Sequence, residues 1–320
     1  MALIIVGVQD RFIYLFLGEN VTIVLSECGG FMIKIAKISG ECFGVNRALN
    51  LAFSCLNQDG ISYLYKEILH NPNVLKALSD KGIECIDNLD GISTDSTIII
   101  RAHGEKKETY EYLEEKGYKY CDTTCLNVVK IHEIIEDKYK NGYSIIILGR
   151  PGHAEVDGDL GWCNEEGIVI ETIEDINEIK ELKRDVLLIC QTTFNEDKAR
   201  EFVKIIKNKF LDKNIEYVDT ICRAQRAIQI SSKKLAKESD LMIVIGGAHS
   251  SNSKELLREC QEVCNSYKFD DIKVFGEWLR KQKDINKSTN IGITAGATVM
   301  KRELEEYKSL IEDYLSEISE

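Results

Sequence analysis

Two stretches of the chain decide its fold: YCDTTCLNVVKIHEIIEDKYKNGYSIIILG at residues 120–149 and YVDTICRAQRAIQISSKKLAKESDLMIVIG at residues 217–246. Aligned without a gap, they share identical residues at paired positions, which include Tyr120 and Tyr217, Asp122 and Asp219, Thr123 and Thr220, Cys125 and Cys222, Ile146 and Ile243, and Gly149 and Gly246. Each stretch predicts a strand, a turn that carries a cysteine, a helix and a second, buried strand. A match of this length indicates an internal structural repeat.

A third, fainter copy lies near the start of the chain. Cys42 follows the apolar stretch IKIAKI at residues 33–38 and precedes a predicted helix over residues 45–56. In all three copies polar residues follow at the ends of predicted strands, namely His70, His103, His153, Thr192, Ser250 and Thr298. Strands buried on both faces are typical of parallel sheets, whose ligands bind beyond the carboxyl ends of the strands. The sequence therefore predicts an α/β fold of three similar lobes in pseudo-threefold arrangement around one central site.

The repeat also predicts lobe boundaries. The first lobe is expected over residues 32–119, the second over 120–216 and the third over 217–320, with a C-terminal helix that can return to the first lobe. Residues 1–31 match no part of the repeat and are expected to be an N-terminal extension of unknown role. Because Met32 immediately precedes the first buried strand, we expect it to be the translation start. The alternative is a genuine N-terminal hairpin that packs on the body of the protein.

Composition excludes several classes of function. With 44% hydrophobic and 29% charged residues the chain can bury a core, which excludes general disorder. Its net charge of −12 argues against nucleic acid as the main partner. No apolar stretch is long enough to cross a membrane, and the first residues lack the basic region of a signal peptide. The 11 cysteines without an export signal therefore indicate the cytoplasm, where thiols stay reduced.

Three cysteines are the strongest candidates for chemistry. Cys42, Cys125 and Cys222 each lie between a predicted strand and a predicted helix, where the positive helix N-terminus lowers the pKa of a thiol and favours metal binding. Three thiolates at one point suit zinc with an open fourth position, or an iron–sulfur cluster with one iron that lacks a protein ligand. Cys121 competes with Cys125, but the repeat pairs Cys121 with Val218 and so favours Cys125.

Side chains that suit an anion site gather at the predicted strand and helix ends: His70, His103, His153, Ser250, Ser251 and Asn252. Histidines and hydroxyls supply hydrogen-bond donors, and a helix N-terminus such as the one predicted at Ser250 binds phosphate readily. Glu155 is the one carboxylate near these groups, two residues after His153, and is the natural general acid.

In their order and number, the motifs resemble those of the 4-hydroxy-3-methylbut-2-enyl diphosphate reductases, the last enzymes of the methylerythritol phosphate route to isoprenoids. The resemblance runs from about Met32 to the C-terminus. The motifs that carry it are GECFGVNRAL, KEILHNPNV, RAHGE, DTTCLNVVKIH, GHAEVDGDLGW, QTTFNED, DTICRAQ, SSNS and TAGAT. This chain departs from the family pattern at Glu41, where a Phe-like residue is commoner, at Leu126 in place of proline, and at Thr298 in place of serine. Residues 299–302 also differ from the family's commoner continuation.

The resemblance implies three α/β lobes around one [4Fe–4S] cluster per chain, with three irons held by Cys42, Cys125 and Cys222 and one iron open to the allylic hydroxyl of the substrate. It implies a diphosphate pocket lined by His70, His103, His153, Ser250, Ser251, Asn252 and Thr298. Glu155, with the Thr192 hydroxyl, would deliver protons in a reductive dehydroxylation that yields isopentenyl diphosphate and dimethylallyl diphosphate. A ferredoxin or flavodoxin would supply single electrons, because the sequence shows no flavin or nicotinamide fingerprint.

Other functions use similar cysteines. A hydro-lyase with a three-cysteine [4Fe–4S] cluster performs no net redox change, and a quinolinate-synthase-like protein also has three lobes but lacks the QTTF and SSNS context. A non-catalytic metal or redox sensor gives no reason for Glu155, Thr192 and the SSNS turn to occur at equivalent positions. The reductase is therefore the favoured prediction.

Overall fold

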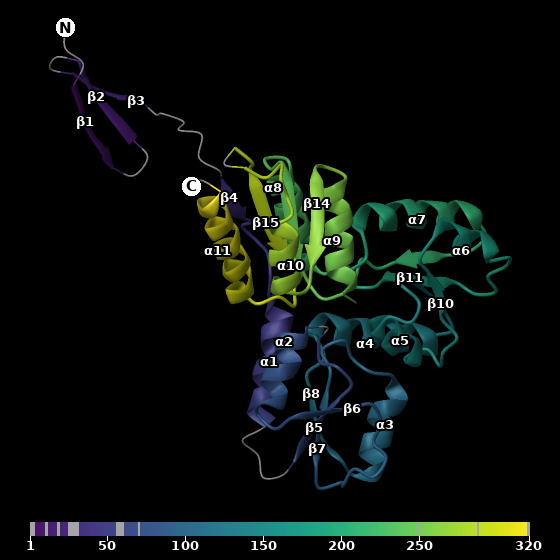
Figure 1. Ribbon diagram of the computed structural model, residues 1–320. Coiled ribbons are helices and arrows are strands. Elements are labelled where there is room, and N and C mark those ends of the chain that lie inside the picture. The colour runs from purple at the N-terminus through teal and green to yellow at the C-terminus, as the bar shows by residue number, and fades with distance from the viewer. Residues whose placement is uncertain are drawn as a thin grey trace.

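The structure, a computed structural model, contains three parallel four-stranded sheets, each covered by helices (Figure 1). It describes residues 32–55, 61–69, 71–248, 250–286 and 288–318, together with the backbone of three strands near the N-terminus. Those strands are β1 (Ile4–Gln9), β2 (Phe12–Leu17) and β3 (Asn20–Val24), which pair antiparallel in a sheet of their own. No helix in the described part of the chain is both long enough and apolar enough to cross a membrane.

The first four-stranded sheet has the order β6-β5-β7-β8. Its strands are β5 (Ser62–Tyr65), β6 (Glu84–Ile86), β7 (Thr97–Ile100) and β8 (Lys119–Asp122), and its helices are α1 (Phe43–Cys55), α2 (Pro72–Ser79) and α3 (Lys107–Lys116). Ile99 points into the core beneath α1 and α2, whereas Ile98 and Ile100 point to the opposite core. The continuous apolar run of β7 is therefore buried on both faces, as expected for a central parallel strand.

The second sheet repeats this topology in the order β10-β9-β11-β12. Its strands are β9 (Ser144–Leu148), β10 (Ile168–Ile170), β11 (Val186–Cys190) and β12 (Ile215–Tyr217), and its helices are α4 (Leu126–Lys140), α5 (Ala154–Gly161), α6 (Ile173–Glu178) and α7 (Glu196–Lys209). Every residue of β11 is buried, and alternate residues enter two separate apolar clusters, one on each face of the sheet.

The third sheet has the order β14-β13-β15-β4. Its strands are β13 (Leu241–Ile245), β14 (Asn265–Phe269), β15 (Ile291–Ala295) and the early strand β4 (Ile33–Ile35), and its helices are α8 (Arg223–Ala236), α9 (Ser251–Gln261), α10 (Ile272–Leu279) and α11 (Lys301–Glu317). The C-terminal helix α11 packs on β15 and β4 of this same sheet.

Strand pairing differs from the predicted lobe boundaries in one consistent way. The strand that precedes each cysteine belongs to the sheet of the preceding lobe: β8 pairs with β7, β12 with β11, and β4 with β15. The helix after each cysteine then packs in the next lobe, as α4 does on β9. Each cysteine therefore lies at a crossing between two lobes, and β4 closes the ring by joining the start of the chain to the third sheet.

Candidate functional site

The three predicted cysteines occupy equivalent backbone positions. Cys125 is the N-cap of α4, Cys222 is the N-cap of α8, and Cys42 immediately precedes α1. Each cysteine N–H donates to a carbonyl just beyond a neighbouring strand, with N–O distances of 3.3 Å from Cys42 to Ala297, 2.9 Å from Cys125 to Ala102 and 2.9 Å from Cys222 to Thr192. These bonds attach the start of each helix to the carboxyl edge of the preceding sheet, so the repeat directs all three thiols toward one centre.

The three thiols line one cavity at this centre, together with Gly44. A Cβ atom at Gly44 would lie 2.8 Å from the Cys125 sulfur and 3.7 Å from the Cys42 sulfur, so glycine leaves the space that these sulfurs share. Asn127 Nδ2 lies 3.3 Å from the Cys222 sulfur. Burial raises the pKa of Cys125 and outweighs the lowering by the backbone hydrogen bond from Asn127, and the neighbouring thiols of Cys42 and Cys222 raise it further. The lowered pKa expected for a thiol at a helix N-terminus is therefore not found for Cys125. The sulfurs are thus close enough to interact electrostatically.

The chemistry of the three thiols indicates which metal group they can bind. Within the described residues, no group of three or more His, Cys, Asp or Glu side chains is arranged to hold a single metal ion. An iron–sulfur cluster makes a different demand, because each cysteine binds its own iron and the sulfurs surround a larger body. Three soft thiolate donors from three lobes, with a glycine that leaves room between them, fit such a cluster.

Cys121 lies outside this cavity. It belongs to β8, and its side chain packs against the apolar cluster beneath α1, where burial raises its pKa to about 12. The structure therefore places Cys125, and not Cys121, beside the other two cysteines.

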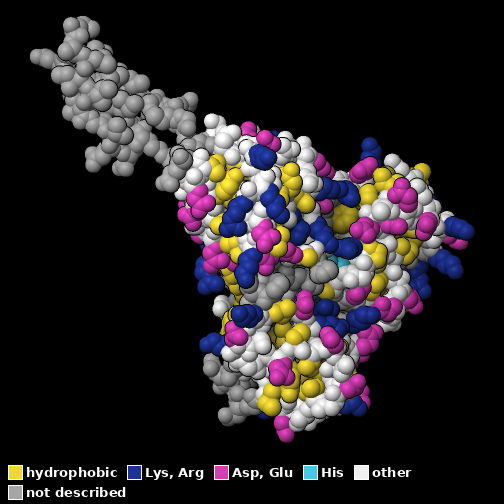
Figure 2. Space-filling view, viewed as in Figure 1, with side chains coloured by type: hydrophobic (Ala, Val, Ile, Leu, Met, Phe, Trp, Pro, Cys, Tyr) yellow, Lys and Arg dark blue, Asp and Glu magenta, His cyan; other side chains and the backbone are white. Residues whose placement is uncertain are grey.

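The central cavity has a volume of about 120 Å³ and is the meeting point of the predicted residues. Those that line it are Cys42, His103, Cys125, His153, Glu155, Thr192, Cys222, Ser250, Ser251, Asn252 and Thr298. His70 lies outside the described residues. On the face shown in Figure 2, a histidine side chain is visible where the lobes meet, with lysine and arginine side chains around it.

Glu155 lies in the first turn of α5 and is only 2% exposed. Its two carboxylate oxygens accept hydrogen bonds from the Thr192 N–H at 2.6 Å and from the Thr192 hydroxyl at 2.7 Å. Burial, reinforced by the nearby carboxyl of Asp159, raises the pKa of Glu155 to about 7 and outweighs the two hydrogen bonds from Thr192. Glu155 is therefore a carboxyl group that can carry a transferable proton near neutral pH.

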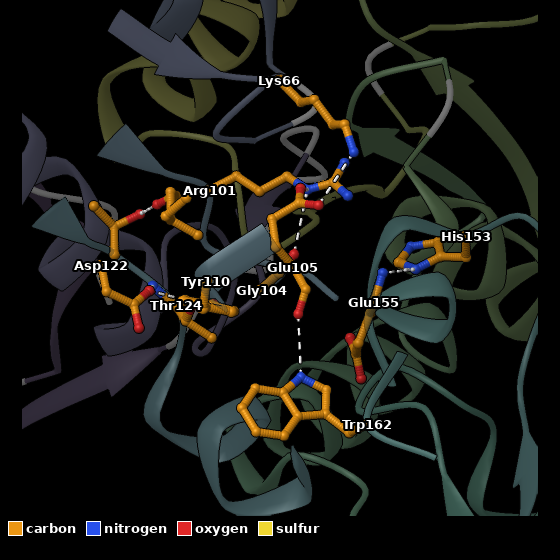
Figure 3. A network of polar contacts seen from close by, with 12 residues as sticks. Lys66, Arg101, Gly104, Glu105, Tyr110, Asp122, Thr124, His153, Glu155 and Trp162 are labelled. Carbon is orange, nitrogen blue, oxygen red and sulfur yellow. Dashed lines mark hydrogen bonds and ion pairs between the residues drawn. The ribbon is translucent and has the colours of Figure 1, made fainter. Parts of the chain in front are cut away.

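His153 is the N-cap of α5, and its Nδ1 accepts the Glu155 N–H at 3.1 Å (Figure 3). An accepting Nδ1 places the proton of the neutral ring on Nε2, which makes that nitrogen a donor. The ring of His103 lies edge-on to His153, with ring centroids 5.7 Å apart. The two imidazoles thus form one corner of the central cavity.

Hydroxyl groups form another part of the cavity. Ser250 caps α9, and its hydroxyl accepts the Ser253 N–H at 3.3 Å. The Ser251 and Thr298 hydroxyls are buried and have no hydrogen-bond partner among the described residues. Because a buried hydroxyl without a partner costs free energy, these two groups point to a ligand that accepts hydrogen bonds here.

Sequence reasoning did not single out several supporting residues. Gln225 donates a hydrogen bond to the Asn252 side chain and so orients that amide. Behind Glu155, Asp159 lies 3.3 Å from His132, whose ring stacks on Trp162 with centroids 4.9 Å apart. The motifs DTICRAQ and GHAEVDGDLGW contain Gln225 and Asp159, but their partners lie far away in the chain and leave no local signal.

Glu105 of the first lobe forms buried ion pairs through its side chain and contacts the end of α5 through its backbone (Figure 3). Glu105 is 1% exposed, and its carboxylate forms ion pairs with Arg101, whose Nε lies 2.6 Å away, and with Lys66, whose Nζ lies 3.1 Å away. Its backbone carbonyl accepts the Trp162 indole N–H at 3.1 Å. Trp162 directly follows α5, so this contact holds the helix that carries Glu155 against the neighbouring lobe.

Comparisons with known proteins show the family to which the chain belongs. A model of the LytB protein family matches residues 33–312. The chain is 37% identical over 287 residues to the 4-hydroxy-3-methylbut-2-enyl diphosphate reductase of Caldanaerobacter subterraneus subsp. tengcongensis, covering 87% of this chain and 97% of that protein. It is also 37% identical over 289 residues to the enzyme of the same name from Clostridioides difficile, covering 88% and 99% of the two chains.

Solved structures show the same fold. The E-1-hydroxy-2-methyl-but-2-enyl-4-diphosphate reductase from Plasmodium falciparum superposes with a TM-score of 0.80 at 26% identity over 88% of both chains. A structure of (E)-4-hydroxy-3-methyl-but-2-enyl diphosphate reductase superposes with a TM-score of 0.63 at 36% identity, over 88% of this chain and 99% of that one. On the sequence match and the shared architecture together, the chain belongs to the LytB protein family.

Proposed function

We propose that this chain is a 4-hydroxy-3-methylbut-2-enyl diphosphate reductase. It removes the allylic hydroxyl of its substrate as water and yields isopentenyl diphosphate and dimethylallyl diphosphate. The reaction consumes two electrons and two protons: the carbon that loses the C–O bond is reduced, one proton leaves with the hydroxyl, and one is added to carbon. The observation that carries the proposal is the single cavity in which three thiols, a buried protonatable carboxyl and unpartnered hydroxyls meet.

The diphosphate binds among the histidines and hydroxyls of the cavity. The Ser251 and Thr298 hydroxyls donate to phosphate oxygens, and His153 donates through Nε2. The N-terminus of α9 adds backbone N–H groups and a favourable dipole. His70, His103, Ser250 and Asn252 complete the proposed pocket. These donors stabilise an anion locally, although the whole chain carries a net charge of −12.

Cys42, Cys125 and Cys222 would hold one [4Fe–4S] cluster through three of its irons. When bound, the cluster supplies electrons one at a time and an iron with an open coordination position. Zinc has no redox chemistry and cannot supply this reduction. The chain's own contribution is to present three thiols from three lobes beside the proton donor.

Glu155 holds the proton that the leaving hydroxyl requires. Its carboxyl is buried and has a pKa of about 7, so a large fraction is protonated at neutral pH. The Thr192 N–H and hydroxyl fix both oxygens of the carboxyl in place. Such orientation lets the proton reach a defined point in the cavity without rearrangement of the site.

The proposed electron donor is a ferredoxin or a flavodoxin, because each electron must arrive separately. The proposed location is the cytoplasm: every described cysteine has a free thiol, as expected in a reducing compartment.

Anaerobic purification followed by iron and sulfide analysis, and then by an assay with the hydroxylated diphosphate and a strong one-electron reductant, tests the proposal. We expect iron and sulfide in the ratio of a [4Fe–4S] cluster and formation of both product diphosphates. A colourless zinc protein would contradict the proposal. Turnover that needs no reductant would instead indicate a hydro-lyase, and a loaded cluster without any turnover would indicate a sensor.

A further inference from the structure

A second cavity lies against the same three cysteines. This outer groove has a volume of about 580 Å³, and the residues it shares with the central cavity are Cys42, Gly44, Cys125, Asn127, Cys222 and Ala224. The cysteines and the starts of α1, α4 and α8 therefore separate the two cavities. Glu155, Thr192 and His153 line the central cavity and do not line the outer groove. The outer groove therefore reaches the thiols from a side that does not face these proposed substrate groups.

The outer groove exposes large apolar side chains. Phe43 is 76% exposed and Leu126 is 47% exposed, and each directly follows a cysteine at the start of a helix. Scattered apolar residues on a surface are ordinary, but two beside a candidate redox centre form a contact point for a partner. Apolar side chains at the middle of an interface supply much of its affinity.

The charged side chains of the groove are mainly cationic. Arg47, Lys130 and Arg223 line it, and its single carboxylate is Asp219. Asp219 is held by Arg226 at 2.6 Å, which offsets its charge. A positive groove on a chain with a net charge of −12 selects an acidic partner and orients it at this face.

We propose that the outer groove is the docking surface for a small acidic protein that carries single electrons. The inference rests on the proposed function, because it takes the three cysteines as the redox centre. The rate of electron transfer falls steeply with distance, and in the described part of the chain this groove is where the cysteines can be approached without entering the substrate cavity. Two carriers are each oxidised by one electron for every substrate reduced. Electron-transfer encounters use small interfaces, which suits a groove of this size.

A charge-reversal variant tests the groove. Lys130→Glu combined with Arg223→Glu places two carboxylates where the carrier would dock, and Leu126→Ser removes an apolar contact without a change in charge. Lys204→Glu combined with Lys207→Glu is the matched control, because both lysines are exposed on α7, outside the groove, and the net charge changes equally. Each variant is assayed with a reduced ferredoxin, with a reduced flavodoxin, and with reduced methyl viologen, which needs no docking surface.

The variants are compared using the protein carrier that gives the lower KM with the parent enzyme. The KM for this carrier should rise at least tenfold in the groove double variant and severalfold in Leu126→Ser. Turnover with methyl viologen and the absorbance of the cluster should stay within twofold of the parent. The parent's carrier KM should rise with added salt, and the groove double variant should lose most of that dependence. The α7 control should behave like the parent.

An unchanged carrier KM in the groove double variant, or an equal rise in the α7 control, would overturn the docking proposal. Failure of the proposed function gives a different result, since the parent enzyme would then show no turnover even with methyl viologen. The two proposals are therefore tested separately.

Discussion

At the scale of single residues, burial decides what Glu155 can do. A carboxyl in water is ionised at neutral pH, but Glu155 is almost fully enclosed beside a second buried carboxyl, Asp159, so its charged form is disfavoured. Thr192 keeps the group oriented without restoring its low pKa. The residue type came from the motif, whereas its protonation comes from the surroundings.

Glu155→Gln should reduce turnover at least 100-fold, since general acid catalysis contributes about 10² to 10⁴ in rate. In the parent, turnover should fall as pH rises above about 7, because Glu155 loses its proton there. Substrate binding and cluster content should be retained, which calorimetry and iron analysis would show. Near-normal turnover of Glu155→Gln would remove Glu155 from its proposed role.

Glu155 also makes a prediction about stability. Its folded-state pKa of about 7 lies above the unfolded value, so its contribution to stability is fully present at pH below the unfolded pKa and is lost as pH rises through 7. Glu155→Gln removes this dependence. Urea unfolding at pH 5.5 and pH 8.5 should show a smaller difference in unfolding free energy for the variant than for the parent, and an equal difference would contradict the pKa.

The variants Cys125→Ser and Cys121→Ser test which of two cysteines, four positions apart in the chain, binds the cluster. Cys125 lines the central cavity, whereas Cys121 packs in the core of the first lobe. Cys125→Ser should therefore lose the cluster absorbance, and Cys121→Ser should keep it with at most a modest loss of stability. Iron and sulfide analysis of both variants is the measurement, and the reverse outcome would mean that the repeat aligns the wrong cysteine.

At the scale of secondary structure, helix N-termini assemble the site. Cys125, His153, Cys222 and Ser250 are each the N-cap of a helix that follows a parallel strand. The carboxyl ends of the strands and the positive ends of the helices thus coincide, which suits both thiolates and a diphosphate. The repeat predicted the helices that follow Cys125 and Cys222, and in the structure α4 packs on β9 and α8 packs on β15.

The start of α7 joins the second lobe to the third. Asn195 caps this helix by accepting the Lys198 N–H at 2.9 Å, and its amide donates to Glu255 at 2.8 Å and Glu259 at 3.0 Å on α9. Burial raises the pKa of Glu259 to about 7. The cap and the link between lobes therefore depend on one side chain, and substitutions can separate them.

Asn195→Ala removes both roles and should lower the free energy of unfolding by about 1–3 kcal/mol. Asn195→Asp keeps the cap but places a carboxylate beside Glu255 and Glu259. The decrease in unfolding free energy should therefore be smaller at pH 5.5 and larger at pH 8.5, where Glu259 has lost its proton. Urea unfolding at both pH values measures this.

Asn141→Ala is the control for Asn195, because the Asn141 side chain is exposed and, among the described residues, its hydrogen bonds are to Asp137 at the end of the same helix. It should change the unfolding free energy by less than about 0.5 kcal/mol. If the decrease in unfolding free energy caused by Asn195→Asp does not grow with pH, Glu259 stays protonated or lies away from residue 195.

At the scale of the whole molecule, the three lobes form a closed ring. In each case an edge strand of one sheet leads directly into the cysteine at the start of the next lobe. This strand is β8 in the first sheet, β12 in the second and β4 in the third, and β4 leads to Cys42. The three thiols therefore converge only when all three sheets are complete. Stability of the lobes and assembly of the site are coupled through these edge strands.

Removal of residues 1–31 should leave this ring intact. The strands β1, β2 and β3 pair with one another and not with the other sheets, and the family match begins at residue 33. A chain that begins at Met32 should keep the melting temperature within about 2 °C and the same turnover. A large loss of either would favour the N-terminal hairpin that packs on the body, and the intact mass of the protein from its natural host tests the start at Met32.

By itself the sequence determined the fold class and the identities of the candidate site residues, because repeated turns and apolar strands are local patterns. Cys42, Cys125, Cys222 and Glu155 were all singled out in this way. Tertiary structure alone decided that β4 belongs to the third sheet and that Cys121 faces a core. It also decided that Asn195 reaches Glu259 and that Glu155 holds its proton near pH 7. These features depend on burial and on contacts between residues far apart in the chain, which no local pattern encodes.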